Sequence, residues 1–291
     1  MIIIDVSGGL GNQMFGYAFA RALSLEKNDK LYISKRLLKN DNLREYTLSN
    51  FNLSKSISLI DTIPKYKIYH WYRYNKNKLY HKLKIKRRDT HVSAIHDSLD
   101  VMNYFEVPYI KNKINIYCGL FQSDMFFDKY RDILKDDFKV ITEYSDKEKV
   151  LLEKIRNSES VCLHIRRGDY LTSPMHNVCT IDYYKRAIEI IKEKVENPTF
   201  YVFSDDKDWV IENFDLDDAV YVTECRYDYI EQNIMSNCKH FILSNSTFSW
   251  WAQYLSDNKE KIVVAPEKWL NNIDNSDIGI YQDGWILAKI N

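Results

Sequence analysis

The stretch Val161-Cys-Leu-His-Ile-Arg-Arg-Gly-Asp-Tyr170 decides the fold of the C-terminal half of the chain. Residues 160–165 form a short apolar run that predicts a buried strand. Two arginines, a glycine and an aspartate follow, which places cations where the backbone turns and a ligand can approach. Arg166 and Arg167 offer planar sets of donors that match a phosphate and keep their charge. The stretch predicts an anion clamp, most simply for a diphosphate, or else a solvated arginine pair balanced by Asp169.

Strands and helices alternate after this stretch, which is typical of a parallel, doubly wound sheet. The apolar runs predict strands at residues 160–165, 199–204, 219–223, 240–244 and 262–265. Helices are expected between them at residues 182–195, 207–214, 227–238 and 246–256. Because ligands bind at the carboxyl ends of the strands in such sheets, functional residues are expected at the strand exits.

Three polar clusters follow directly after three of these strands. They are His164-Ile-Arg-Arg-Gly-Asp169, Ser204-Asp-Asp206 and Ser244-Asn-Ser-Thr247. The third also begins a helix, where hydroxyl groups, backbone N–H groups and the helix dipole favour a phosphate. Asp205 or Asp206 suits a ribose, or a guanine, whose N1 and N2 atoms are donors. Together the clusters predict a nucleoside-diphosphate pocket.

The N-terminal half opens as a strand, a glycine-rich turn, a helix and a second strand. They are expected at residues 2–6, 7–13, 12–25 and 30–34. Met14 stands where a dinucleotide-binding turn needs its third glycine, and Ser34 replaces the acid that would hold a ribose. We therefore expect no nicotinamide or flavin here. The turn places backbone N–H groups, Asn12 and Gln13 beside a ligand site, or it only lets the helix and strand pack closely.

Composition limits the class of protein. The 291 residues suffice for two domains, and 45% apolar with 28% charged residues is ordinary for a globular chain. Lys+Arg and Asp+Glu balance at 41 each, so net charge indicates no nucleic acid as a partner. The five cysteines form no Cys-x-x-Cys pair and are expected to be reduced thiols. With no signal peptide and no apolar run of about 18 residues, a cytoplasmic location is expected.

Residues 62–88 are unusually basic, with ten Lys or Arg, no acid, and many tyrosines. A solvated face of a surface helix at residues 68–85 explains this pattern, and peripheral contact with the inner face of the membrane is the alternative. A polar, acidic segment at residues 137–149 marks the expected domain boundary near residue 145. It predicts an N-terminal domain at residues 1–145 and a C-terminal domain at residues 146–265.

Five motifs, in this order, resemble those of bacterial α-1,2-fucosyltransferases, which form glycosyltransferase family 11. They are Gly8-Gly-Leu-Gly-Asn-Gln-Met-Phe15, Gln122-Ser-Asp124, His164-Ile-Arg-Arg-Gly-Asp-Tyr170, Phe203-Ser-Asp-Asp206 and Ser244-Asn-Ser-Thr-Phe-Ser-Trp-Trp251. The chain departs from the family at Gly16, where a Gln is frequent, and at Asp124, where a Glu is frequent. These departures bear on the choice of acceptor.

The resemblance implies a GT-B architecture, in which two Rossmann-like α/β domains face each other across a cleft and residues 266–291 cross back to the first domain. It also implies transfer of fucose from GDP-fucose, with inversion, to the 2-hydroxyl of a galactose-terminated oligosaccharide. Two other classes remain open. One is another GT-B sugar-nucleotide transferase, and the other is a non-enzymatic binder of polyanions or membrane surfaces that uses residues 62–88.

Roles follow from the chemistry of such a transfer. Arg166 is expected to hold the β-phosphate, because negative charge develops there as the fucosyl–phosphate bond breaks. Arg167 either contacts the donor or supports the fold through Asp169, and His164 lines the nucleotide pocket or is a satisfied strand histidine. The full set of expected binding residues is His164, Arg166, Arg167, Asp205, Asp206, Ser246, Thr247, the Phe248 amide, Gly9, Gly11, Asn12 and Gln13.

An inverting displacement favours a base for the acceptor hydroxyl. Asp169 is the first candidate because it lies nearest the phosphate clamp, and Asp124 is the second. An aspartate paired with arginine is a poor base because its pKa falls, so the leaving phosphate is a third acceptor for the proton. Asp206-Lys-Asp208 matches the Asp-x-Asp of metal-dependent transferases, but arginine makes a metal redundant. We expect no metal and no cofactor apart from the donor.

Overall fold

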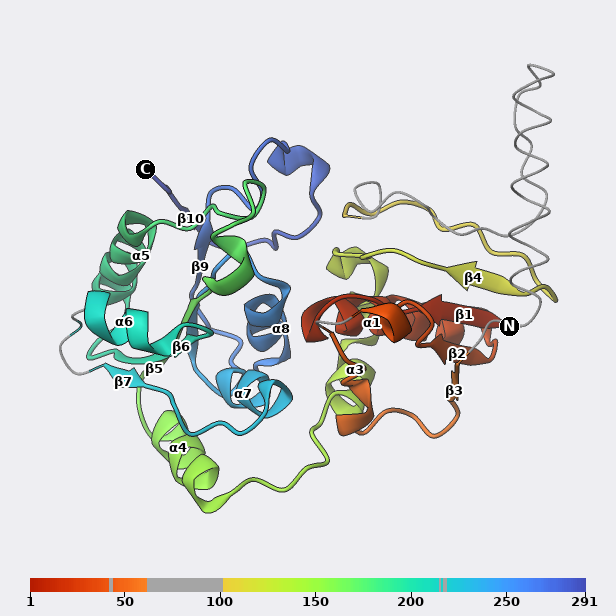
Figure 1. The fold of residues 1–291 in the computed structure, drawn as a ribbon, viewed down its shortest axis with the longest axis horizontal. Coiled ribbons are helices and arrows are strands. Elements are labelled where there is room, and N and C mark those ends of the chain that lie inside the picture. Colours follow the sequence, from red (N-terminus) through yellow and green to blue (C-terminus); the bar gives the residue numbers. More distant parts are fainter. Residues whose placement is uncertain (42–43, 62–101, 215, 217–218) are drawn as a thin grey trace. The chain divides into compact units, whose positions relative to one another are not determined.

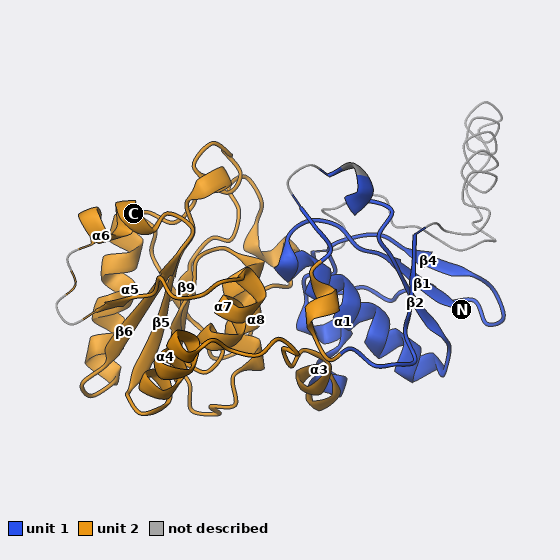
Figure 2. Ribbon diagram, turned by 60° about the horizontal axis from the view of Figure 1, so that its bottom comes forward, with its two compact units in different colours: residues 1–46, 53–131 blue, residues 47–52, 132–291 orange. Residues whose placement is uncertain are grey.

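The computed structural model describes residues 1–41, 44–61, 102–214, 216 and 219–291. The basic stretch at residues 62–88 lies outside these residues. The chain divides into two compact units (Figure 2): unit 1 comprises residues 1–46 and 53–131, and unit 2 comprises residues 47–52 and 132–291. The division at residue 131 falls before the boundary predicted near residue 145. The reason is that the acidic segment packs with unit 2, where Phe138 meets Trp251 with ring centroids 5.1 Å apart.

Unit 1 is built on a four-stranded parallel sheet in the order β3-β2-β1-β4 (Figure 1). The strands are β1 (Ile2–Asp5), β2 (Leu31–Ser34), β3 (Ser58–Ile60) and β4 (Asn115–Tyr117). The long helix α1 (Leu10–Lys27) packs on β1 and β2. Its Phe19 stacks on Phe121, with ring centroids 3.8 Å apart, and meets Tyr117 edge-on. The predicted strand–turn–helix–strand opening is confirmed.

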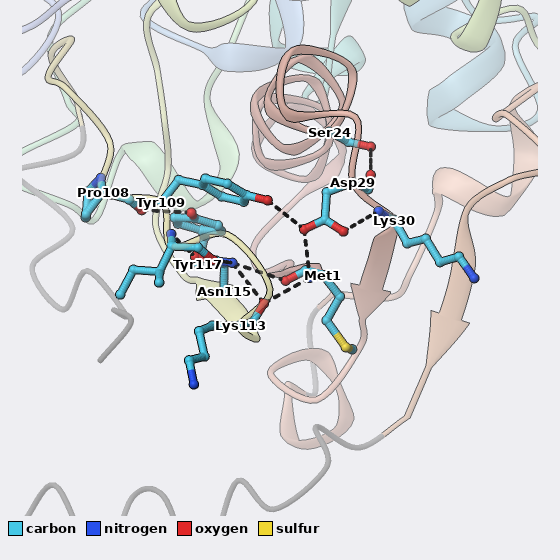
Figure 3. Close-up of polar contacts among 10 residues, drawn as sticks. Met1, Ser24, Asp29, Lys30, Pro108, Tyr109, Lys113, Asn115 and Tyr117 are labelled. Carbon is cyan, nitrogen blue, oxygen red and sulfur yellow. Dashed lines mark hydrogen bonds and ion pairs between the residues drawn. The ribbon is translucent and has the colours of Figure 1, made fainter. Parts of the chain in front are cut away.

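The amino-terminal edge of this sheet is closed by a polar network around Asp29 (Figure 3). The Asp29 carboxylate pairs with the amino group of Met1 at 2.7 Å and accepts a hydrogen bond from the Tyr109 hydroxyl at 3.0 Å. Asn115 donates to the carbonyls of Ile110 and Lys113. These bonds occupy the edge of the sheet that lies away from the glycine-rich turn.

Unit 2 is built on a six-stranded parallel sheet in the order β10-β9-β8-β5-β6-β7. The strands are β5 (Ser160–Ile165), β6 (Thr199–Ser204), β7 (Val220–Tyr221), β8 (His240–Ile242), β9 (Val263–Pro266) and β10 (Ile286–Ala288). The order reverses between β5 and β8, which is where ligands bind in doubly wound sheets. The predicted alternation of strands and helices is confirmed.

Helices cover both faces of this sheet. The helices of unit 2 are α4 (Asp146–Arg156), α5 (Ile181–Lys194), α6 (Lys207–Asn213), α7 (Asp228–Met235) and α8 (Thr247–Leu255), while α3 (Arg131–Asp137) lies where the chain passes from unit 1 to unit 2. Helices α5 and α6 lie on one face, and α7 and α8 on the other (Figures 1 and 2). The 3-10 turns are η1 (Leu38–Asn40), η2 (Leu48–Asn50), η3 (Asp124–Phe126), η4 (Asp128–Tyr130), η5 (Gly168–Tyr170) and η6 (Asn275–Asp277). In α8, Trp250 and Trp251 are fully buried and belong to the core.

The C-terminal segment differs from the expectation that residues 266–291 cross back to the first domain. Strand β10 pairs in parallel with β9, and the whole segment belongs to unit 2. Ala288 and Ile290 account for this placement, because both are buried in the apolar core of that unit. All five cysteines are free thiols. No helix in the described ranges is long and apolar enough to cross a membrane.

Helix α4 is anchored by a buried carboxylate. Glu148 is fully buried, accepts the Ser145 N–H in a capping box, and pairs with the Arg226 guanidinium at 2.9 Å. Burial alone would raise the pKa of Glu148, but hydrogen bonds from the Arg226 side chain and backbone and from Ser145 lower it to about 2. The pair ties the start of α4 to the segment before α7.

We expect Glu148→Gln to lower the free energy of unfolding by about 2 kcal/mol at pH 7, because the change weakens the cap and leaves Arg226 without its carboxylate. The pKa is lower in the folded state, so the stabilisation is present above the unfolded pKa of about 4.3 and is lost as pH falls towards 2. Urea unfolding followed by tryptophan fluorescence measures both effects. The exposed Glu153→Gln on the same helix is the control, and equal stability of Glu148→Gln and the wild type at pH 7 contradicts the prediction.

Candidate functional site

Arg166 stands at the exit of β5 and is held by two carboxylates. Its Nη2 donates to Asp169 Oδ1 at 2.5 Å, and its Nη1 lies 3.2 Å from Asp205 Oδ2. Burial disfavours the charged guanidinium, but Asp205 and Asp169 outweigh it and raise the pKa of Arg166. Within the described part of the chain its Nε has no hydrogen-bond partner. The guanidinium is therefore fixed in position while donor capacity is left over for a ligand.

Arg167 forms its hydrogen bonds within the protein, to the two aspartates that follow β6. Its backbone N–H donates to Asp205 Oδ1 at 2.8 Å, and its Nε donates to Asp206 Oδ2 at 2.9 Å. The guanidinium lies over the Trp209 ring, 3.3 Å from the centroid. The sequence pointed to Asp169 as the partner through which Arg167 would support the fold. The structure instead pairs Arg167 with Asp206, because the chain turns at Arg167 and directs the two arginines to different aspartates.

Gly168 allows this close arrangement. It adopts a positive φ of 29°, and a Cβ at this position would lie 2.5 Å from Asp205 Oδ2. A side chain here would strain the backbone and push against the carboxylate that holds both arginines. The glycine in the Arg-Arg-Gly-Asp stretch is therefore required by the approach of Asp205.

The ends of β5 and β8 are joined by a buried hydrogen bond. His164 Nδ1 and Ser244 Oγ are 2.8 Å apart, and His164 is 3% exposed. Burial, and then the charge of Arg166, lower the pKa of His164 to about 3, so its ring is neutral at physiological pH. Of the two interpretations of His164, these contacts support the satisfied strand histidine, which still packs against Phe248 with ring centroids 5.6 Å apart.

The N-terminus of α8 lies beside the arginine site. Ser246 is the N-cap and accepts the Phe248 N–H at 3.3 Å, so this amide, expected in the phosphate clamp, already has a partner. Tyr170 lies between the two parts: its ring faces the Arg166 guanidinium at 5.3 Å, and burial raises the pKa of its hydroxyl while the nearby Ser246 side chain lowers it. Thr247 follows at the first position of the helix, half-buried. The sequence did not identify Tyr170 as a residue between these parts.

A cavity of about 560 Å³ opens at the exit of β6. It is lined by residues 204–208 and 225–228 and by Glu231 of α7. Asp205 and Asp206, expected at a ribose or a guanine, line its wall but are paired with the arginines. Glu231 was not predicted, because nothing in its local sequence distinguishes it from a solvated helix residue.

The candidate residues of unit 1 gather around the glycine-rich turn. Gly8 has a φ of 73°, Gly9 is the N-cap of α1, and Gly11 lies buried in its first turn. Gln13 is fully buried and donates to the carbonyls of Gly8 at 2.9 Å and Glu45 at 2.7 Å. Its side-chain amide therefore holds the turn in shape, and any effect on a ligand acts through the turn.

The first and second family motifs meet in this unit. Gln122 Nε2 donates to Asn12 Oδ1 at 2.9 Å, and both Gln122 and Ser123 are buried. Asp124 follows at the start of η3 and is partly exposed. The structure thus brings the first two motifs together in unit 1 and the other three together in unit 2.

Comparisons with known proteins agree with this arrangement. The sequence profile described as "Glycosyl transferase family 11" matches residues 1–289. The O-antigen biosynthesis glycosyltransferase WbnK of Escherichia coli is 31% identical over 97% of this chain and 98% of that protein. An alpha-1,2-colitosyltransferase of the same organism is 29% identical over 98% of both chains. A galactoside 2-alpha-L-fucosyltransferase of Caenorhabditis elegans is 26% identical over 49% of this chain and 42% of that protein.

Among solved structures, fucosyltransferase NodZ from Bradyrhizobium has a TM-score of 0.53. At 14% identity, covering 88% of this chain and 93% of that one, this likeness establishes the fold alone. The two Rossmann-like units agree with it, so the expected α/β, GT-B fold is confirmed. The profile match along nearly the whole chain, together with a full-length relative above 30% identity, shows that this chain belongs to glycosyltransferase family 11.

Proposed function

We propose that this enzyme transfers L-fucose from GDP-fucose to the 2-hydroxyl of a terminal β-galactose, with inversion at the anomeric carbon. The observation that carries the proposal is Arg166, held by Asp169 and Asp205 at the exit of β5, with Tyr170 between its guanidinium and the N-cap Ser246 of α8. Such a site suits a diphosphate. The α-1,2 linkage is supported by family relatives named as α-1,2-transferases.

In this reaction the bond between the sugar C1 and the β-phosphate oxygen breaks, and its electron pair stays on GDP. Arg166 and the start of α8 face the oxygens that gain this charge. They are oriented before the reaction begins, so little reorganisation is needed as the charge develops. Asp206, the first residue of the Asp-x-Asp match, is already paired with Arg167. Arginine thus supplies the positive charge, and we propose that the transfer needs no metal ion and no cofactor beyond the donor.

We propose Asp169 as the base that accepts the proton of the 2-hydroxyl. Two arginines here face three aspartates, so the cluster carries a net negative charge before the donor binds. An incoming diphosphate must therefore compete with a carboxylate for Arg166. Asp169, with 52% of its side chain exposed, yields more readily than Asp205, which also holds the Arg167 N–H. A displaced Asp169 would lie beside the reacting carbon. Asp124 of unit 1 and the leaving phosphate are the alternatives.

GDP-colitose is a second candidate donor, because a full-length relative is named an α-1,2-colitosyltransferase. Colitose is fucose without its 3-hydroxyl group, so the same diphosphate site serves GDP-colitose. The two donors differ by one hydroxyl, and a site that hydrogen-bonds this group rejects the deoxy sugar strongly.

For Arg166→Ala we expect the affinity for GDP to fall at least tenfold and kcat to fall by about 10²–10³, because a charged donor to the leaving group is lost. Calorimetry with GDP, UDP and ADP in excess EDTA measures binding, and release of GDP from GDP-fucose measures turnover. Arg186→Ala on α5 is the control for losing an arginine elsewhere. GDP binding that is absent in the wild type, or equal in wild type and Arg166→Ala, rules out the diphosphate clamp.

For Asp169→Asn we expect kcat to fall about 100-fold while the affinity for GDP is unchanged or higher, since a base is removed together with a competitor for Arg166. The acidic limb of the pH profile of kcat should disappear in the variant. If GDP affinity falls in step with kcat, Asp169 positions Arg166 and the base assignment is wrong.

Incubation of the enzyme with GDP-fucose or GDP-colitose and a panel of galactose-terminated oligosaccharides identifies the transfer. We expect an α-1,2-fucosylated product, assigned by NMR, and the same rate with excess EDTA. Faster transfer of colitose would reassign the donor, and a rate abolished by EDTA and restored by Mg²⁺ or Mn²⁺ would contradict the metal-independent mechanism.

A further inference from the structure

The cavity at the exit of β6 is a direct neighbour of the phosphate clamp. Asp205 belongs to both, because it lines the cavity and pairs with Arg166. A nucleoside diphosphate held at Arg166 can therefore extend its nucleoside past Asp205 into this space. The inference developed here rests on the proposed function, since it takes a diphosphate at Arg166 as given.

The carboxylates of this cavity differ in how far their hydrogen-bonding capacity is already used. Asp205 accepts the Arg167 N–H on Oδ1 and meets Arg166 through Oδ2. Asp206 accepts a hydrogen bond from the Arg167 side chain. Glu231 lies 3.6 Å from Lys207 Nζ, which is longer than a hydrogen bond, although only 16% of its side chain is exposed. A carboxylate this far from water and this weakly bonded is costly unless a ligand supplies donors.

The neighbours of Glu231 explain its ionisation. Burial raises the pKa of Glu231 to about 7, Lys207 opposes this, and Asp228 and Asp205 add to it. The Cys225 and Cys162 thiols also interact with Glu231, and burial raises the pKa of both, that of Cys225 to about 12. In the free enzyme the carboxyl group is therefore partly protonated near neutral pH.

Lys207 and Glu231 together match the Watson–Crick edge of guanine. That edge presents the O6 acceptor beside two donors, N1–H and N2–H₂. A lysine ammonium only donates, and a carboxylate accepts through two oxygens. Adenine has an acceptor at N1, and uracil has a single N–H between two carbonyls, so neither base satisfies this pair. We propose that Glu231 recognises the guanine of the donor by accepting hydrogen bonds from N1–H and N2–H₂, with Lys207 donating to O6.

This assignment moves base recognition away from Asp205 and Asp206. Their carboxylates hold the two arginines. If either carboxylate bound the guanine instead, its ion pair would break and the arginines would lose their fixed positions. Glu231 pairs with neither arginine, and it comes from α7, whereas the arginines lie on the loop after β5. The base and the phosphates are then recognised by different elements of unit 2.

Inosine diphosphate tests the assignment, because hypoxanthine keeps O6 and N1–H but lacks the N2 amino group. By calorimetry we expect the wild type to bind GDP about tenfold more tightly than IDP, the cost of leaving one carboxylate oxygen without its donor. In Glu231→Gln the affinity for GDP should fall at least tenfold, and the GDP-to-IDP ratio should approach one. Glu212→Gln, an exposed glutamate of α6, is the matched control, and thermal melting checks the fold of each variant.

Lys207→Ala separates the two contacts. Measured at about pH 9, where the Glu231 carboxylate stays ionised without Lys207, the change should weaken GDP and IDP equally, because both carry O6, and leave their ratio unchanged. The wild-type preference for GDP should also increase between about pH 6 and pH 8, as the Glu231 carboxylate forms, and Glu231→Gln should lack this increase. If the wild type binds GDP but Glu231→Gln keeps both its affinity and its GDP-to-IDP ratio, the base assignment is overturned and the proposed function stands. If the wild type binds no GDP, the proposed function itself fails.

Discussion

The site in unit 2 depends on the ion pairs between two arginines at the exit of β5 and two aspartates at the exit of β6. Asp205 is the central member, because it bonds the backbone of Arg167 and the side chain of Arg166. Its approach is possible because Gly168 has no side chain. Parallel strands bring these residues together although residues 166 and 205 are far apart in sequence. The Arg166 guanidinium, which we propose binds the diphosphate, is thus fixed before any substrate arrives, and such preorganised charge lowers a reaction barrier.

The convergence of these residues could be predicted from the sequence because it follows from topology. Strands β5 and β6 were expected at residues 160–165 and 199–204 and have these bounds in the structure. Both are apolar, buried runs that end in polar clusters. Once alternating helices indicate a parallel sheet, all carboxyl ends lie at one edge, and the clusters must meet there. The five motifs, in their order along the chain, then indicated glycosyltransferase family 11.

The pairing of charges could not be predicted in the same way. Arg166 and Arg167 are adjacent and chemically identical, and which one faces the ligand depends on backbone angles at Arg167 that no local pattern encodes. Glu231 is a polar residue within a short helix, and it lines a cavity because the fold places α7 beside the start of α6. Strand β10 is three residues long and is recognisable only by its pairing with β9. Each of these features arises from tertiary contacts.

Three carboxyl groups of unit 2, those of Asp205, Asp169 and Glu231, have different environments, and each environment favours a different role for the same functional group. Asp205 is bonded on both oxygens and is difficult to displace, so it suits a structural role. Asp169 holds Arg166 but is half exposed, which is why we propose that a phosphate displaces it and that it then acts as the base. Glu231 is shielded from water and lacks a close donor, so it favours a ligand that brings two. The more hydrogen bonds and ion pairs a carboxyl group makes within the protein, the less free it is to bind substrate. The groups that support the site are therefore different from those proposed to act on the substrate.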